Sequence, residues 1–230
     1  MRQYSEDSGI KVLDRAIAIM RSISAGEKML AELSSDTGLP RATTHRIATA
    51  LEVHHILART ESGAWTIGPA LASYVTQTSP QLLSAAASLM RDLVAQTGES
   101  VQLYQLTGNT RTCIAAEEPT SGLTYTVPVG SQLPLTAGSA ARVFAAHGLL
   151  DDSVSFPEEE LAPVRETGLA ESVAEREVGL ASVSTAIVDS TGKVVAVLSI
   201  SGPTERLHPS PIAKWGKVLR AAAKKLNTQL

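Results

Sequence analysis

The spacing of apolar residues changes abruptly near the middle of the chain, and this change constrains the fold more than any other feature. Up to Gly98, apolar residues recur at helical spacing, three or four positions apart. From Val101 onward they mostly alternate with polar residues, as they do in half-buried strands. A helical first part, followed by antiparallel strands with helices packed on them, predicts an α+β fold with two domains.

The first part has the layout of a winged helix-turn-helix. Helices are expected over three segments: Gly9–Ala25, Met29–Thr37 and the residues that follow Pro40. Two short apolar runs within Ile56–Ile67 flank a Glu-Ser-Gly sequence, which is typical of a hairpin turn. Helix, helix, turn, helix and two-stranded hairpin is the order of a winged DNA-binding domain.

Glycine and proline separate the two parts of the chain. Gly68-Pro69 follows the hairpin, and Ser79-Pro80 is suited to begin a new helix. We therefore expect a DNA-binding domain over residues 1–75, a linker helix at about 69–79 and a second domain over 80–230.

The third helix carries its polar side chains close to its own start, in the run GLPRATTHRIATALE. A recognition helix needs this arrangement, because its N-terminal residues face base edges and phosphates. Arginine can bind guanine with two hydrogen bonds, and threonine hydroxyls can hold phosphate oxygens. The candidate residues for binding double-stranded DNA are Arg41, Thr43, Thr44, His45 and Arg46 on the helix, and Arg59 on the hairpin. Taken alone, the helix favours a solvated face on a helical bundle, but the preceding helix, the turn and the hairpin together favour DNA.

The second part alternates strands with helices. A long helix is expected from Pro80 to Gly98, and the charged stretch Asp151–Glu160 is expected to be a loop or a frayed helix. Further helices are expected over Ala137–His147 and Ser210–Thr228. The expected strands are Val101–Thr107, Arg111–Ala116, Leu123–Val129, Leu180–Asp189 and Val194–Ser201.

Serine residues recur at alternate positions inside two of these apolar strands. Ser182 and Ser184 share one face of their strand, and Ser199 and Ser201 share one face of the next. If these faces converge, their hydroxyls line a small, mostly apolar pocket suited to a small metabolite. The alternative is that they are ordinary sheet residues bonded to backbone or water.

Nothing in the sequence indicates catalysis, a cofactor or a metal site. The chain contains no nucleophile elbow, no zinc-protease motif and no P-loop. Its single cysteine, Cys113, lies in an apolar strand pattern and is expected to be an inert buried thiol. The absence of a disulfide pair, of a signal pattern and of a long apolar run predicts a cytoplasmic protein. The absence of catalytic motifs predicts that it is not an enzyme.

Several segments resemble the IclR family of bacterial transcriptional regulators. The run LSSDTGLPRATTHRIATALEVHHILARTESGAWTIGPAL looks like the DNA-binding domain of that family. The segments VGSQLPLTAGSAARVFAAHG and GLASVSTAIVDSTGKVVAVLSISGPTERL resemble its effector-binding domain, which has a GAF-like fold. The segments TGESVQLYQLTGNTRTCIAAEEPTSGLTYTVPVGS and EREVGLASVS look like the NdgR/LtbR branch, whose members regulate leucine biosynthesis.

The resemblance implies a set of effector-binding residues at matching positions. These are Leu133, Ser139, Ala140, Ser172, Leu180, Ser182, Ser199 and Ser201. The family often has an acid where this chain has Ser172 and a histidine near Thr136. Three alternatives follow: the pocket is less polar, it binds a different ligand, or it has lost ligand binding.

Together the resemblance and the residue patterns imply a homo-oligomeric repressor, a dimer or a dimer of dimers, that binds a partly palindromic operator. It would control amino-acid biosynthesis genes in response to a small effector, such as an amino acid or a pathway intermediate. Two alternatives stay open. The second domain would only oligomerise, or it would be a small-molecule enzyme that depends on Ser182 or Ser199.

Overall fold

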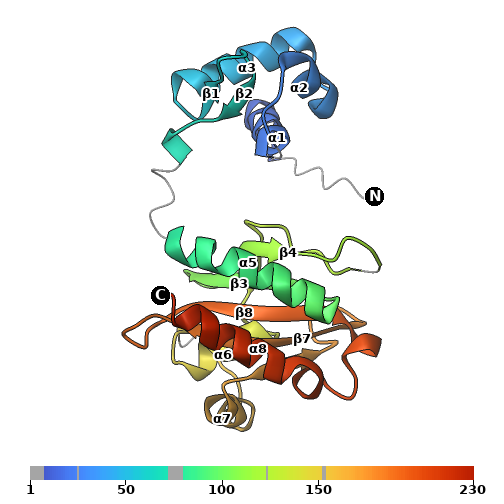
Figure 1. Ribbon diagram of the computed structural model, residues 1–230, viewed down its shortest axis with the longest axis vertical. Helices are drawn as coiled ribbons and strands as arrows, with labels where there is room; N and C mark the ends of the chain where they lie inside the picture. Colours follow the sequence, from blue (N-terminus) through green and yellow to red (C-terminus); the bar gives the residue numbers. More distant parts are fainter. Residues whose placement is uncertain (1–7, 25, 72–79, 123, 152–153) are drawn as a thin grey trace. The chain divides into compact units, whose positions relative to one another are not determined.

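The computed structural model of the protein describes residues 8–24, 26–71, 80–122, 124–151 and 154–230. The chain divides into two compact units, Met1–Gln77 and Thr78–Leu230 (Figure 1). Each unit has a hydrophobic core of its own. Most of the predicted linker helix, at about 69–79, falls on residues outside the described ranges.

The first unit is a winged helix-turn-helix. Its elements are α1 (Lys11–Ser24), α2 (Leu30–Thr37), α3 (Arg41–Val53), β1 (Leu57–Arg59) and β2 (Trp65–Ile67). The core residues come from all three helices and both strands: Ile19, Ile23, Leu33, Ile47, Ala48, Leu57 and Trp65. On α3, Ala48 faces this core and Ala50 is exposed.

The turn between α2 and α3 is set by a glycine and a proline. Gly38 ends α2 in the left-handed conformation, with φ 66°, which glycine adopts without a steric penalty. Pro40 precedes the first residue of α3, and the hydroxyl of Ser34 donates to the carbonyl of Leu39 at 2.6 Å. These contacts hold the start of α3 at a defined angle to α2.

The second unit contains one antiparallel sheet of six strands. Their order across the sheet is β5-β4-β3-β8-β7-β6. The strands are β3 (Ser100–Thr107), β4 (Thr110–Glu117), β5 (Gln132–Pro134), β6 (Ala170–Val173), β7 (Leu180–Val188) and β8 (Val194–Pro203). The helices are α5 (Pro80–Thr97), α6 (Ser139–Ala146), α7 (Glu158–Thr167) and α8 (Pro211–Asn227), with a short 3-10 turn, η1 (Thr204–Leu207).

Helices cover both faces of this sheet. On one face, α5 and α8 pack against alternate residues of β3, β7 and β8, including Leu103, Ile187 and Leu198 (Figure 1). On the other face, α6 and α7 pack against Tyr104, Cys113 and Val197. Among the described helices, none combines the length and apolar character that a membrane crossing requires.

The structure overturns one expectation in the second unit and makes another more specific. The predicted strand Leu123–Val129 is wrong, because residues 124–129 form no strand and β5 pairs with β4 instead. Pro128 lacks the N–H that a ladder needs, and the backbone meets β4 just after it, where Gly130 donates to the Cys113 carbonyl at 2.7 Å and Cys113 donates to the Ser131 carbonyl at 2.9 Å. The charged stretch expected as a loop or frayed helix contains the start of α7 at Glu158, where three glutamates favour the helix N-terminus.

Candidate functional site

The N-terminal half of α3 presents a positively charged surface. Arg41, His45 and Arg46 are exposed, and Thr43 is half-buried. Residues four apart lie above one another on a helix, so Arg41 and His45 form one row and Arg46 lies on the next. Neither arginine forms an ion pair within the part of the chain that the structure describes. Both guanidinium groups are therefore available for contacts outside the protein.

Thr44 does not lie on this surface. It is completely buried, and its hydroxyl donates to the Pro40 carbonyl of the preceding turn at 3.2 Å. Its position one turn before Ile47 places it on the core side of α3. The side chain supports the turn and has no access to DNA.

Arg59 lies on the first strand of the hairpin, and its guanidinium has partners within the domain. It is stacked 3.9 Å from the ring centre of Trp65, its neighbour on β2, and it is 3.5 Å from the Glu52 carboxylate. Its side chain is 39% exposed, so one edge still faces solvent. Arg59 is thus held more firmly than Arg41 or Arg46.

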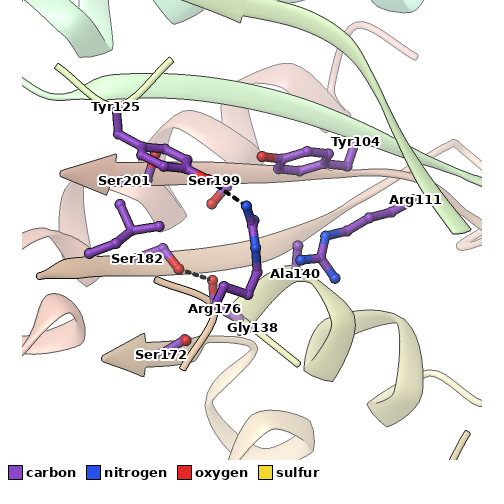
Figure 2. A pocket seen from close by; sticks show the side chains of 12 residues that line it. Tyr104, Arg111, Tyr125, Gly138, Ala140, Ser172, Arg176, Ser182, Ser199 and Ser201 are labelled. Atoms are coloured by element: carbon purple, nitrogen blue, oxygen red, sulfur yellow. Dashed lines mark hydrogen bonds between the residues drawn. The ribbon is translucent and has the colours of Figure 1, made fainter. Parts of the chain in front are cut away.

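The second unit contains a cavity between the sheet and the start of α6. Figure 2 shows its side chains. The residues that line it are Tyr104, Arg111, Tyr125, Gly138, Ser139, Ala140, Ser172, Arg176, Leu180, Ser182, Ser199 and Ser201. Seven of the eight residues expected at the effector site are in this set. Leu133 is not, because it packs into the core beside α6 and Arg111, opposite it in the sheet register, reaches the cavity instead.

The serine hydroxyls form a connected chain across the floor of the cavity. Ser139, the first residue of α6, is 2.7 Å from the hydroxyls of both Ser182 and Ser184, and Ser184 donates to Ser199 at 3.0 Å. The register explains this, since Ser184 lies opposite Ser199 and Ser182 lies opposite Ser201 on adjacent strands. Alternation along two strands and their pairing therefore bring these hydroxyls together.

Arg111 enters the cavity from β4, which lies between β5 and β3 in the sheet. It is 1% exposed, and its Nη1 donates to the carbonyls of Pro134 at 2.6 Å and Ala137 at 3.1 Å. Its Nε is buried without a hydrogen-bond partner. Burial, and after it the charge of Arg176, lower the pKa of this guanidinium to about 10.

Arg176 enters from the loop between β6 and β7. Its Nη2 donates to the hydroxyl of Tyr125 at 2.6 Å (Figure 2). Burial is the main cause of the raised pKa of Tyr125, and that of Tyr104 is raised for the same reason. Both phenols are therefore neutral near pH 7 and supply hydroxyl groups rather than charges.

The sequence patterns did not identify five of the lining residues: Tyr104, Arg111, Tyr125, Gly138 and Arg176. One signal was present for Arg111, because a charged residue at an alternate position of an apolar strand must either reach solvent or enter a polar site. Cys113 is buried as expected, and burial raises its thiol pKa to about 12. In the described ranges, no three His, Cys, Asp or Glu side chains are grouped as a metal site requires.

A winged helix-turn-helix joined in one chain to a sheet domain with an enclosed polar cavity defines the class of two-domain transcriptional regulators. Comparison with known families gives the same result. Residues 12–61 match the IclR helix-turn-helix domain, and residues 74–158 and 155–228 match the C-terminal domain of bacterial transcriptional regulator IclR. The chain belongs to the IclR family, whose members are DNA-binding transcriptional regulators and not enzymes.

Relatives and solved structures extend over nearly the whole chain. The HTH-type transcriptional repressor AllR of Escherichia coli K12 is 30% identical over 248 residues, covering 96% of this chain and 91% of that protein. A putative IclR-family regulator from Rhodococcus sp. is 29% identical, with a TM-score of 0.59 and coverage of 99% and 96%. The Thermotoga maritima IclR shares the fold at 20% identity, with a TM-score of 0.66 and coverage of 96% and 97%.

One structural relative contains a bound ligand. It is an IclR homologue from Microbacterium hydrocarbonoxydans in complex with 4-hydroxybenzoate, 20% identical, with a TM-score of 0.63 and coverage of 95% and 98%. At this level of identity the similarity concerns the fold alone.

Proposed function

We propose that this protein is a ligand-responsive repressor that binds a partly palindromic operator as a homo-oligomer. The exposed N-terminal half of α3 carries this proposal. There Arg41 and Arg46 are free of ion pairs within the described residues, and the preceding turn and the hairpin hold the helix in place. The word repressor rests on the AllR relatives, which bear that name.

In this proposal, the polar and charged residues of the first unit have different roles in binding the operator. Arg46 and Arg41 reach base edges in the major groove, while Thr43 and His45 contact phosphates or bases beside them. Arg59 holds the hairpin through Trp65 and offers its exposed edge to the DNA backbone. Thr44 has no part in this surface.

Self-association is supported by an apolar stripe on α1. Ile10, Leu13 and Ile17 lie on one side at helical spacing, and they are 57%, 48% and 37% exposed. A second copy of α1 is the proposed partner, since a two-fold dimer places two recognition helices on the two half-sites of a palindrome.

The cavity of the second unit is the proposed effector site. Ser139 and Ala140 at the start of α6, the hydroxyls of Ser172, Ser182, Ser199 and Ser201, and the apolar side of Leu180 line it. A ligand there changes operator affinity only if it binds the DNA-competent and DNA-incompetent arrangements unequally. Binding at this site therefore has to alter the arrangement of the dimer.

Regulation of leucine or other amino-acid biosynthesis genes is the finer part of the proposal. It rests on the resemblance to the NdgR/LtbR branch alone, and the AllR names of the relatives do not support it. Target genes are therefore best identified by direct binding.

Fluorescence anisotropy with the purified protein tests the proposal. Its own upstream region and a leucine-biosynthesis promoter are titrated beside random DNA at two salt concentrations. We expect at least one promoter to bind about a thousand-fold tighter than random DNA. Equal affinity for all three DNAs would contradict operator recognition, and specific binding to the upstream region alone would contradict the leucine assignment.

The small volume of the cavity, about 20 Å³, favours a second candidate function. This space holds about one water molecule, so the second domain would serve only to oligomerise the regulator. A thermal-shift screen with metabolites separates the two, because a ligand that binds the native state raises the melting temperature.

A further inference from the structure

The side chains that line the cavity carry positive charges and no negative ones. Arg111 and Arg176 are both present, and no Asp or Glu belongs to the set among the described residues. The acids nearest in sequence to Arg176 lie behind the lining, where they bind lining residues other than the two arginines. Glu175 accepts from Arg142 at 2.8 Å and from the Gly138 N–H at 3.1 Å, and Glu177 bonds the Tyr125 hydroxyl. The two guanidinium groups thus have no carboxylate as a partner within the described chain.

Arg111 is a buried charged group without an anionic partner in the described chain. It is 1% exposed, and its partners are two neutral carbonyls, which do not neutralise its charge. Its Nε is buried without a partner. An ionised group in such a position is destabilising unless an opposite charge pairs with it. Burial and the nearby charge of Arg176 both lower its pKa, in keeping with a cation that has no anionic partner.

The two arginines approach each other over Gly138. The point that a Cβ at this residue would occupy is 3.1 Å from Nη2 of Arg111 and 3.3 Å from Cδ of Arg176. Gly138 also has φ 97°, a backbone conformation that side chains disfavour. The absence of a side chain thus permits both this conformation and the close approach of the two arginines. Two like charges close to one another in a partly dry site attract a ligand of higher negative charge than one arginine would need.

We propose that the ligand of this cavity is a small organic acid that carries two negative charges and no ammonium group. The inference rests on the proposed effector-binding role of the second domain. Arg111 pairs with one anionic group at the buried end, and Arg176 pairs with the other at the mouth, with the fork geometry that guanidinium groups offer to carboxylates. The serine hydroxyls and Tyr104 bind the remaining polar atoms.

This charge pattern disfavours an amino acid as the effector. Its ammonium group would lie in a lining that offers hydroxyls but no carboxylate in the described chain, beside two guanidinium groups. Repulsion between these charges is strong where water is scarce. Leucine itself is therefore a poor fit, although a diacid from amino-acid metabolism would fit.

Ligand entry requires Arg176 to move. The cavity of about 20 Å³ is too small for an organic acid while this side chain lies inside it. Arg176 is half-buried and bonded to a neutral hydroxyl, so an incoming anionic group offers it a stronger, charge-assisted bond. The ligand thus takes the place that the arginine side chain now fills.

Calorimetric titration of the full-length protein with one carbon skeleton at different charges tests the inference. The probes are succinate, succinamate and succinamide, with two, one and no negative charges, and aspartate, which adds an ammonium group to succinate. Malonate, glutarate and inorganic phosphate extend the set to other sizes of dianion. We expect a dianion to bind at least about ten-fold tighter than its monoanionic or ammonium-bearing counterpart.

Substitutions of Arg176 show whether dianion binding depends on the charge of this side chain or only on its volume. Arg176→Gln should weaken dianion binding at least about ten-fold and bring it close to monoanion binding, whereas Arg176→Lys should retain part of the preference. Arg165→Gln, which removes a surface charge bonded to Glu158, is the matched control and should bind as the parent does. Unchanged dianion binding in Arg176→Gln would overturn the inference.

Two further results would overturn it. One is equal or tighter binding of succinamide or aspartate, and the other is no binding of any dianion at about 20 mM, where even a weak site is detectable. Operator titrations on the same samples keep the two proposals apart. Specific DNA binding without anion binding contradicts the dianion alone, and absence of specific DNA binding contradicts the proposed regulator.

Discussion

Replacement of Arg46 by alanine separates DNA recognition from protein stability. The side chain is exposed and forms no ion pair within the described chain, so its loss should change the free energy of unfolding by no more than about 0.5 kcal/mol. If Arg46 binds a base, its loss should weaken operator binding by about 1–3 kcal/mol, or roughly 5- to 150-fold. Urea denaturation measures the first quantity, and anisotropy titration measures the second.

A matched control accounts for the change in net charge. Arg220→Ala removes the same charge from an exposed position on α8 in the second unit. Affinity for operator and random DNA should be unchanged in this variant. In Arg46→Ala, a loss confined to the operator indicates a base contact. An equal loss on random DNA, with a salt slope lower by about one, indicates a phosphate contact. Parental affinity on both DNAs would refute the placement of Arg46 at the interface.

Three more predictions concern the core, the cavity and the dimer. Leu198→Ala removes a fully buried side chain from the centre of β8 and should lower the free energy of unfolding by about 2–5 kcal/mol in urea denaturation. A loss below about 1 kcal/mol would contradict the placement of Leu198 in the core. Gly138→Ala should lower the free energy of unfolding more than Gly148→Ala does. Both glycines have positive φ, but only the first substitution brings a Cβ to 3.1 Å from Arg111. Equal losses of unfolding free energy in the two variants would argue against that contact. Leu13→Glu should convert a dimer to monomers in sedimentation experiments; an intact dimer would exclude the α1 stripe.

The first unit could be predicted closely because its signals are local. Gly38 ends one helix and Pro40 begins the next, and both effects operate within a few residues. The burial of Thr44 follows from its place one turn before Ile47, although polarity alone had placed it on the DNA surface.

The second unit could be predicted where strands are long and pair with sequence neighbours. The β7–β8 hairpin was found because alternation and a turn mark both strands. The short strands β5 and β6 have three and four residues, too few to show a period. The run before Pro128 is apolar enough to resemble a strand, but local composition does not show which strand would pair with it.

The same distinction applies to the cavity. Its serines were found because two of the contributing strands are neighbours, so spacing along each strand and register between them suffice. Its arginines lie on β4 and on the loop after β6, 65 positions apart in the chain, and only the folded sheet brings them over Gly138. Residue type alone suggests a solvated arginine in each case, because most arginines are exposed. The charge of the site is thus a property of the tertiary structure.

The loop that carries Arg176 also links the cavity to α6 and α7. Glu175, the preceding residue, accepts from the Gly138 N–H and from Arg142, and Arg142 in turn donates to Glu160 of α7 at 2.7 Å. Adjacent residues of one short loop therefore hold the mouth of the cavity and the contact between two helices. Because Glu175 and Arg176 are consecutive residues, a ligand that displaces Arg176 also changes the contacts of Glu175. Any effect of the ligand on DNA affinity has to begin with such a difference in contacts. A ligand that binds the DNA-competent and DNA-incompetent arrangements equally well does not change the balance between them.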